Sequence, residues 1–247
     1  AAYGLLRFGL PFFPNASAEF APIAMWLGIF GVFYGAFLAF AQTDIKRLIA
    51  YTSVSHMGFV LIGIYAGNLL TLQGLVIQML AHGICAGGLF ILCGQLYERL
   101  HTRDLREMGG LWGRFSYLPA LMMFFAAALL GLPSTGNFVG EFLILLGAFK
   151  VVPVITIIAT ASLILAGVYS LIMIHRALFG QPKSQDKLPD LSGRELSLIV
   201  SLAGILLFLG LYPQPVLNVS QGAMARIQHI YAPSASSVIA PASTLAP

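Results

Sequence analysis

The stretch LLGLPSTGNFVGEFLILLG (residues 129–147) lies inside an apolar run that extends from 116 to 149. As one continuous helix this run would be about 50 Å long, far more than the roughly 30 Å of hydrocarbon in a bilayer. The run contains Pro133, which lacks a backbone donor, and Gly136, which weakens helix propagation. The stretch therefore predicts a membrane helix that is broken around Pro133, Gly136 and Asn137.

The composition of the whole chain indicates a membrane protein. Of its 247 residues, 58% are hydrophobic and 9% are charged, whereas charged residues make up roughly a quarter of an ordinary soluble domain. The runs do not show the period of two that is typical of barrel strands, so the predicted fold is all-α, a polytopic transmembrane helical bundle. Besides 116–149, runs long enough to cross the bilayer are expected at about 21–42, 47–67, 70–97, 152–175 and 195–212.

Four parts of the chain are predicted. Residues 1–13, which open without an initiator Met or a signal-peptide pattern, are interpreted as the end of a truncated transmembrane helix in a longer protein. Residues 14–212 are predicted to form a bundle of about six helices. Residues 213–231 have a weak amphipathic pattern and are expected to form an interfacial helix, and the Pro-rich residues 232–247 a loose tail.

The basic residues are distributed unequally if the spans alternate in direction. Ten fall on one side and three on the other, and the positive-inside rule then places the larger group in the cytoplasm and the C-terminus on the outer, periplasmic side. The larger group comprises Lys46, Arg47, Arg99, Arg103, Arg106, Arg114, Arg176, Lys183, Lys187 and Arg194, and the smaller one Arg7, Lys150 and Arg226.

Glu141 is the only one of the nine acidic residues that falls inside a predicted span. A charge at the bilayer centre costs roughly 2.5–3.5 kcal/mol even on the translocon insertion scale, so this glutamate is a candidate functional residue. Free backbone donors beyond the break favour its charged form and desolvation favours its neutral form, which suits a group that exchanges protons. The alternative is a packing clamp in which Glu141 pairs with a basic residue.

Two histidines are predicted near the middle of the membrane. His56 follows Lys46 by ten residues, about 15 Å along a helix, and His82 lies in the middle of the next span. Histidine transfers protons near neutral pH, and membrane proton relays use His and Glu side chains, so His56, His82 and Glu141 are predicted to form a relay. The alternatives are buried neutral histidines and a metal site, which no short ligand spacing supports.

The glycines and cysteines give further expectations. Gly83, Gly87 and Gly88 follow His82 and predict a second local unwinding, and Gly31 and Gly35 predict close packing of two helices. Cys85 and Cys93, roughly 12 Å apart along one helix, are expected to be packing residues. Since no iron–sulfur spacing, haem motif or nucleotide-binding loop occurs, no cofactor site is expected on this chain.

Three motifs carry a resemblance to a known family: TDIKRLIAYTSVSHMGFV (43–60), IQMLAHGICAGGLFILCGQLYERLHTRDLREMGGL (77–111) and GLPSTGNFVGEF (131–142). They resemble the antiporter-like subunits of the proton-pumping NADH:quinone oxidoreductase, respiratory complex I. The resemblance implies the C-terminal part of a fourteen-helix fold with broken helices, from within the eighth helix to the end.

The same resemblance implies residue roles. His56 and His82 match the central histidines of the family, and Glu141 matches the carboxylate on its broken twelfth helix, where lysine is usual in the L type, so the glutamate favours the M type. Asp44 and Lys46 match a DxK element at the cytoplasmic entrance, although they can equally be an ordinary charge pair at a helix start.

The expected function is that of a proton-translocating subunit of a bacterial inner-membrane NADH:quinone oxidoreductase, an enzyme whose redox chemistry lies in other subunits. The resemblance implies FMN, iron–sulfur clusters and quinone there, and L-type and N-type antiporter-like subunits as partners. Two alternatives stay open: a subunit of a multisubunit Na⁺/H⁺ antiporter or membrane-bound hydrogenase, and a non-conducting structural half-subunit.

Overall fold

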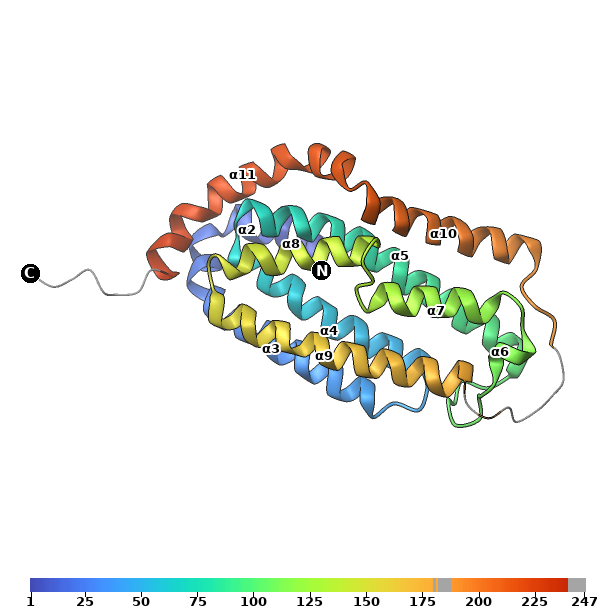
Figure 1. The fold of residues 1–247 in the computed structure, drawn as a ribbon. Helices are drawn as coiled ribbons and strands as arrows, with labels where there is room; N and C mark the ends of the chain where they lie inside the picture. The colour runs from blue at the N-terminus through green and yellow to red at the C-terminus, as the bar shows by residue number, and fades with distance from the viewer. Residues whose placement is uncertain (180, 182–187, 240–247) are drawn as a thin grey trace, which may run out of the picture.

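The computed structural model describes residues 1–179, 181 and 188–239, without the side chains of 232–239. This part of the chain is a bundle of helices that run mostly side by side (Figure 1), and the predicted all-α class is confirmed for it. The elements are α1 (Ala2–Gly4), the π-helical turn η1 (Leu5–Gly9), α2 (Leu10–Phe12), α3 (Pro14–Phe40), α4 (Ile45–Ala66), α5 (Leu69–Leu100), α6 (Leu111–Arg114), α7 (Leu118–Leu129), α8 (Gly136–Phe149), α9 (Pro153–Ile174), the π-helical turn η2 (His175–Phe179), α10 (Gly193–Leu211) and α11 (Gln214–Ile239).

Within the described residues, five helices are long and apolar enough to cross a membrane: α3, α4, α5, α9 with η2, and α10. The remaining predicted span is divided into α7 and α8, which have 12 and 14 residues and are each shorter than the roughly 20 residues of a full crossing. The two half-helices follow one another along the bundle, and α9 returns alongside them (Figure 1). This interruption agrees with the break predicted from the sequence.

Local sequence explains where several helices begin and end. Asp44 accepts hydrogen bonds from the backbone N–H groups of Lys46 (2.8 Å) and Arg47 (3.1 Å), and so caps the start of α4. Gly67 ends α4 in the left-handed conformation with φ 66°. Helix α3 begins at Pro14, earlier than the predicted 21, because a proline at the first helical position has the required φ and needs no donor.

Helix α5 is continuous, so the second unwinding expected beside His82 is wrong. Gly83 and Gly87 face open space, with no atom within 4 Å of the position that a Cβ would occupy. A single glycine weakens a helix by only about 1 kcal/mol relative to alanine and removes no hydrogen bond. In contrast to the stretch around Pro133, these glycines do not oblige the backbone to leave its helical hydrogen bonds in lipid.

Helices α3 and α4 approach one another through glycine, as predicted, but with one different residue. A Cβ on Gly35 would lie 2.6 Å from the backbone nitrogen of Ser55, and one on Gly28 would lie 2.9 Å from the carbonyl oxygen of Gly58. Gly31 faces open space. Residues seven apart differ by about 20° around a helix and residues four apart by about 40°, which places Gly28 closer than Gly31 to the face of Gly35.

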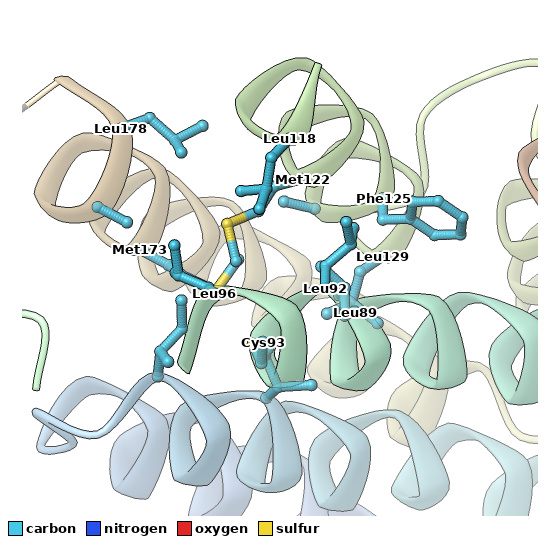
Figure 2. Close-up of a cluster of buried hydrophobic side chains, with 14 of the residues drawn as sticks. Leu89, Leu92, Cys93, Leu96, Leu118, Met122, Phe125, Leu129, Met173 and Leu178 are labelled. Carbon is cyan, nitrogen blue, oxygen red and sulfur yellow. The ribbon is translucent and has the colours of Figure 1, made fainter. Parts of the chain in front are cut away.

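The largest apolar cluster packs α7 against α5 and the end of α9. Burial of these side chains holds the first half-helix in place, and the two free cysteines are buried, as expected of packing residues. Figure 2 labels the central members: Leu89, Leu92, Cys93 and Leu96 from α5, Leu118, Met122, Phe125 and Leu129 from α7, and Met173 and Leu178 from α9 and η2.

A polar clamp, made by Arg99, Asp190 and Glu195, joins the end of α5 and the start of α7 to the start of α10. The Asp190 carboxylate accepts hydrogen bonds from the backbone N–H groups of Ser116 and Tyr117, both at 2.6 Å. Arg99 donates to the carbonyl oxygen of Asp190 (3.1 Å) and to Glu195 (3.0 Å). Burial acts to raise the pKa of Asp190, but the backbone N–H donors outweigh it and hold that pKa below its ordinary value.

Helix α11 covers one end of the bundle, beside α2, α3 and the start of α5 (Figure 1). Tyr231 is 1% exposed, and its hydroxyl donates to the carbonyl oxygen of Tyr65 (3.1 Å). The helix continues through Pro233 to Ile239, although the sequence placed its end at 231. Residues 240–247 of the predicted tail lie outside the described residues.

The connections agree with the alternation that the charge count assumes. Those between α3 and α4 and between α5 and α7 lie at one end of the bundle, as do the end of η2 and the start of α10 (Figure 1). Those between α4 and α5 and between α8 and α9 lie at the other end. Lys183 and Lys187 lie outside the described residues. The assignment of the basic end to the cytoplasm stays a prediction, as does the interpretation of residues 1–13 as the end of a longer helix.

Candidate functional site

The first half-helix, α7, ends in a pattern of backbone hydrogen bonds that glycine favours. Gly131 has φ 86°, its N–H donates to the carbonyl oxygen of Ala128 (3.1 Å), and the N–H of Leu132 donates to that of Ala127 (3.0 Å). This is the Schellman arrangement, in which glycine takes the left-handed position after the last helical turn. Pro133 follows two residues later, where the chain cannot return to a helix.

The break keeps its backbone groups paired within itself. The hydroxyl of Thr135 donates to the carbonyl oxygen of Leu132 (2.7 Å), and the side-chain amide of Asn137 donates to that of Ala128 (3.0 Å). Asn137 is fully buried and thus ties the first turn of α8 to the last turn of α7. Because lipid offers no hydrogen-bond partners, this internal pairing is what allows a non-helical segment at such a depth.

Glu141, one turn after Asn137, receives side chains from two other helices. Its Oε1 lies 2.5 Å from Nδ1 of His56 on α4 and accepts a hydrogen bond from Nε2 of Gln78 on α5 (3.1 Å). Glu141 is 5% exposed, His56 is 2% exposed and Gln78 is fully buried. Side chains from α4 and α5 therefore converge on the carboxyl group of α8.

The second nitrogen of the His56 ring also has a polar neighbour. Nε2 of His56 lies 3.5 Å from the hydroxyl of Tyr169 on α9, a residue that is 1% exposed. If the tyrosine donates to Nε2, the ring carries its proton on Nδ1 and donates to Glu141, so a single tautomer satisfies both contacts. His56 therefore has polar groups on both sides, and a proton can arrive at one nitrogen while another leaves from the other.

His82 lies beside this group without a direct hydrogen bond to it. The centroids of the His56 and His82 rings are 5.3 Å apart, and His82 is 6% exposed. Nδ1 of His82 has no hydrogen-bond partner among the described residues. The structure thus brings together all three residues that the sequence singled out as a relay, with one step, from His56 to His82, that no direct hydrogen bond bridges.

Asp44 and Lys46 lie away from this cluster, at the start of α4. Lys46 precedes His56 by ten residues, about 15 Å along the helix. Asp44 caps the helix and lies 3.6 Å from Nε of Arg103. Lys46 is exposed, with its amino group 6.0 Å from the centroid of the Phe90 ring. Their role at a proton entrance stays a prediction.

Sequence reasoning missed two members of the site, Gln78 and Tyr169. Gln78 precedes His82 by four residues and so lies on the same face of α5, a spacing that a search for buried polar neighbours of the histidine would have found. Tyr169 belongs to a different helix and has no such spacing, so only the fold places it. Among the described residues, no group of three or more His, Cys, Asp or Glu side chains is arranged to share a metal ion.

These features define a class: multi-pass helical membrane proteins in which a broken helix presents a buried carboxyl group to ionisable side chains of neighbouring helices. Within that class, the chain belongs to the NADH:quinone oxidoreductase/Mrp antiporter transmembrane family, whose family model matches residues 1–167. The family resemblance inferred from the three sequence motifs is confirmed.

The relatives are similar along most of this chain. NADH-quinone oxidoreductase subunit M of Pseudomonas aeruginosa is 69% identical over 228 residues, and that of Escherichia coli strain K12 is 68% identical over 231 residues. Each comparison covers 92% of this chain but 45% of the relative, so the chain spans about half the length of the curated relatives it matches.

Solved structures share the fold. A chain of respiratory complex I from Thermus thermophilus with bound NADH is 31% identical and superimposes with a TM-score of 0.88, over 93% of this chain and 49% of that one. A chain of the archaeal membrane-bound sulfane sulfur reductase is 22% identical with a TM-score of 0.78, over 89% of this chain and 45% of that one, and shows likeness of fold alone.

Proposed function

We propose that this chain works as part of an M-type, proton-translocating subunit of an NADH:quinone oxidoreductase, and that Glu141, His56 and His82 relay protons inside the membrane. The observation that carries the proposal is the 2.5 Å contact between Oε1 of Glu141 and Nδ1 of His56, both almost fully buried. A carboxyl group and an imidazole at this distance can exchange a proton, and buried ionisable residues of membrane helices commonly mark such pathways.

The arrangement suggests how a proton passes through His56. A proton taken up at Nε2, on the side of Tyr169, allows the Nδ1 proton to pass to Glu141 without rotation of the ring. His82 lies on a further side of the ring and would extend the path into α5. Moving each charge against 100 mV requires about 2.3 kcal/mol, so the relay must be driven by events elsewhere in the assembly.

In this proposal the redox reaction takes place in other subunits, on FMN, iron–sulfur clusters and quinone, and L-type and N-type antiporter-like subunits are neighbours in the membrane arm. The basic end of the bundle, with Asp44 and Lys46, faces the cytoplasm, and α11 faces the periplasm. The names of the relatives, NADH-quinone oxidoreductase subunit M, support membership of such a complex, and the unequal distribution of basic residues supports the orientation.

The test is NADH-driven proton uptake by inverted membrane vesicles, with Glu141→Gln introduced in the gene that encodes this chain. We expect uptake per NADH to fall, or uptake and NADH:quinone turnover to fall together, in a complex that still assembles. Glu98→Gln is the matched control, because it removes an exposed carboxylate from the end of α5, far along the same bundle.

Unchanged uptake per NADH in the Glu141→Gln complex would contradict the proposal and favour a non-conducting structural role. Sodium-coupled transport, or hydrogen evolution without NADH oxidation, would instead assign the chain to a Na⁺/H⁺ antiporter or a membrane-bound hydrogenase.

A further inference from the structure

Gln78 is a fully buried primary amide in the middle of a membrane helix, and the relay described above does not use it. Its Nε2 donates to Oε1 of Glu141 at 3.1 Å. An ionised carboxylate accepts hydrogen bonds only, so the N–H end of the amide has to face Glu141 while the oxygen end faces away. The orientation of the amide thus follows from the chemistry of its partner.

Helix packing holds the Gln78 side chain in this position. A Cβ on Gly140 would lie 2.6 Å from Oε1 of Gln78 and 2.8 Å from its Cβ, so the side chain lies directly against the backbone of α8. The backbone of α8 therefore restricts the Gln78 side chain to one rotamer, because interiors packed this closely leave little freedom for another.

The two oxygens of Glu141 consequently have different surroundings. Both side-chain contacts, from His56 and from Gln78, are made to Oε1. Oε2 faces the break, since a Cβ built on Gly131 would lie 3.5 Å from it. One oxygen is held between α4 and α5, and the other is turned toward the non-helical segment between α7 and α8.

We propose that Gln78 is a positioning residue for Glu141: its amide holds Oε1 beside His56 and thereby turns Oε2 toward the break at Gly131. The carboxyl group then receives a proton from His56 on one side and presents its second oxygen to the path beyond. This inference rests on the proposed function, in which Glu141 exchanges protons with His56. It assigns to Gln78 control of orientation and no proton transfer of its own.

The experiment compares Gln78→Met, Gln95→Met and Glu141→Gln in the assembled complex. Methionine keeps the length and approximate volume of glutamine but cannot donate, so a packing role of Gln78 would survive the change. Gln95 is the matched control, because it is a second buried glutamine on α5. Among the described residues, the Oε1 atoms of Gln78 and of Gln95 both have no hydrogen-bond partner. Proton uptake per NADH and the infrared C=O band of Glu141, which is identified by its loss in Glu141→Gln, are the two measurements.

We expect Gln78→Met to lower proton uptake by about ten-fold, the equivalent of one hydrogen bond to a charged group, and to raise the frequency of the Glu141 band, because a donor to the carboxyl group is lost. Gln95→Met should change neither. If Gln78→Met assembles poorly, Gln78→Asn provides the second variant. Asparagine keeps the amide, but its side chain is shorter by one methylene group, so the amide moves away from Glu141 and the same band should shift.

The outcomes separate the two proposals. Loss of uptake in Glu141→Gln with normal uptake and an unshifted band in Gln78→Met would overturn the role of Gln78 and leave the relay in place. Normal uptake in Glu141→Gln would overturn the relay, and a shift of the carboxyl band in Gln78→Met would then decide whether Gln78 orients the group.

Discussion

At the scale of single residues, the chain uses two carboxylates in opposite ways. Asp190 accepts hydrogen bonds from backbone N–H groups at the start of α7, near the surface of the bundle. Glu141 is buried beside His56, whose ring can give up or take a proton, and beside the amide of Gln78, which does not ionise. The donors of Asp190 are backbone groups at the start of α7 and favour its charged form, so that residue is structural. The proposed relay requires the opposite of Glu141, namely that its charge changes.

Asp190→Ala should lower the free energy of unfolding by about 1–2 kcal/mol at pH 7, because the start of α7 loses its cap. The folded-state pKa of Asp190 is below its unfolded value of about 3.9. The stabilisation that ionised Asp190 contributes is therefore complete at pH values above the unfolded-state pKa. It is lost as the pH falls through the lower pKa of the folded state.

The measurement for this prediction is the Tm of the detergent-solubilised protein from pH 7 to pH 3. The difference in Tm between wild type and Asp190→Ala should be constant down to about pH 5 and should become smaller below about pH 4. A gap of constant size down to pH 3 would contradict it, and Glu98→Ala, which removes an exposed carboxylate near the same end, is the control.

The sequence allowed the main residues of the site to be predicted because depth in a membrane can be counted along a helix. The sequence predicts His56 and His82 at mid-depth in two spans and Glu141 inside a third, and the structure brings them together. The contacts of Gln78 and Tyr169 depend instead on which faces of α5 and α9 point inward. That information comes from packing between helices, which hydropathy does not contain.

At the scale of elements, α5 and α8 form the closest pair around the site. Gly140→Ala should lower the free energy of unfolding by about 1–3 kcal/mol, because the added methyl group would overlap the backbone of α5 and force the helices apart. A Cβ there would lie 2.8 Å from Cα of Gln78.

The Tm of the purified protein in lipid nanodiscs measures this effect. Gly83→Ala is the control for a glycine on the same pair of helices, since no atom lies within 4 Å of its Cβ position. That control should keep or slightly raise the Tm, because alanine favours a helix. Equal losses in both variants would show that close packing at Gly140 is not the cause.

The predicted break at Pro133 is present in the structure, whereas the predicted unwinding beside His82 is absent because α5 is continuous. Pro133 removes a donor shortly after Gly131, which takes the left-handed φ of 86° at the end of α7, so the two residues together end the helix. Gly83 and Gly87 only lower propensity, and tertiary packing overrides propensity. The predicted span limits differ from the observed ones most at Pro14 and Pro233, where prolines were compatible with the helix backbone.

At the scale of the whole molecule, α11 closes the end of the bundle opposite the Arg99–Asp190–Glu195 clamp. Tyr231→Ala should release this helix, because it removes a fully buried ring that lies against Gly67 and a hydrogen bond to Tyr65. The loss is expected to be about 3–5 kcal/mol for the packing, as for other large-to-small changes in a core.

Hydrogen exchange of the α11 amides measures that release. Exchange should become faster in Tyr231→Ala and change little in Val219→Ala, since Val219 lies on the same helix and is 88% exposed. Unchanged exchange in Tyr231→Ala would show that other contacts hold α11 against α2, α3 and α5.

The break between α7 and α8 has one further property: its sequence can be transferred to another protein. Its hydrogen bonds, from the carbonyl oxygen of Ala126 to the N–H of Val139, join residues within this short segment. The same run of amino acids, transplanted into an uninterrupted apolar helix of another membrane protein, should interrupt that helix at the chosen depth. A host protein would have to supply small residues against the segment, as Gly210 of α10 does beside Ser134 and Ala81 of α5 does beside Gly136.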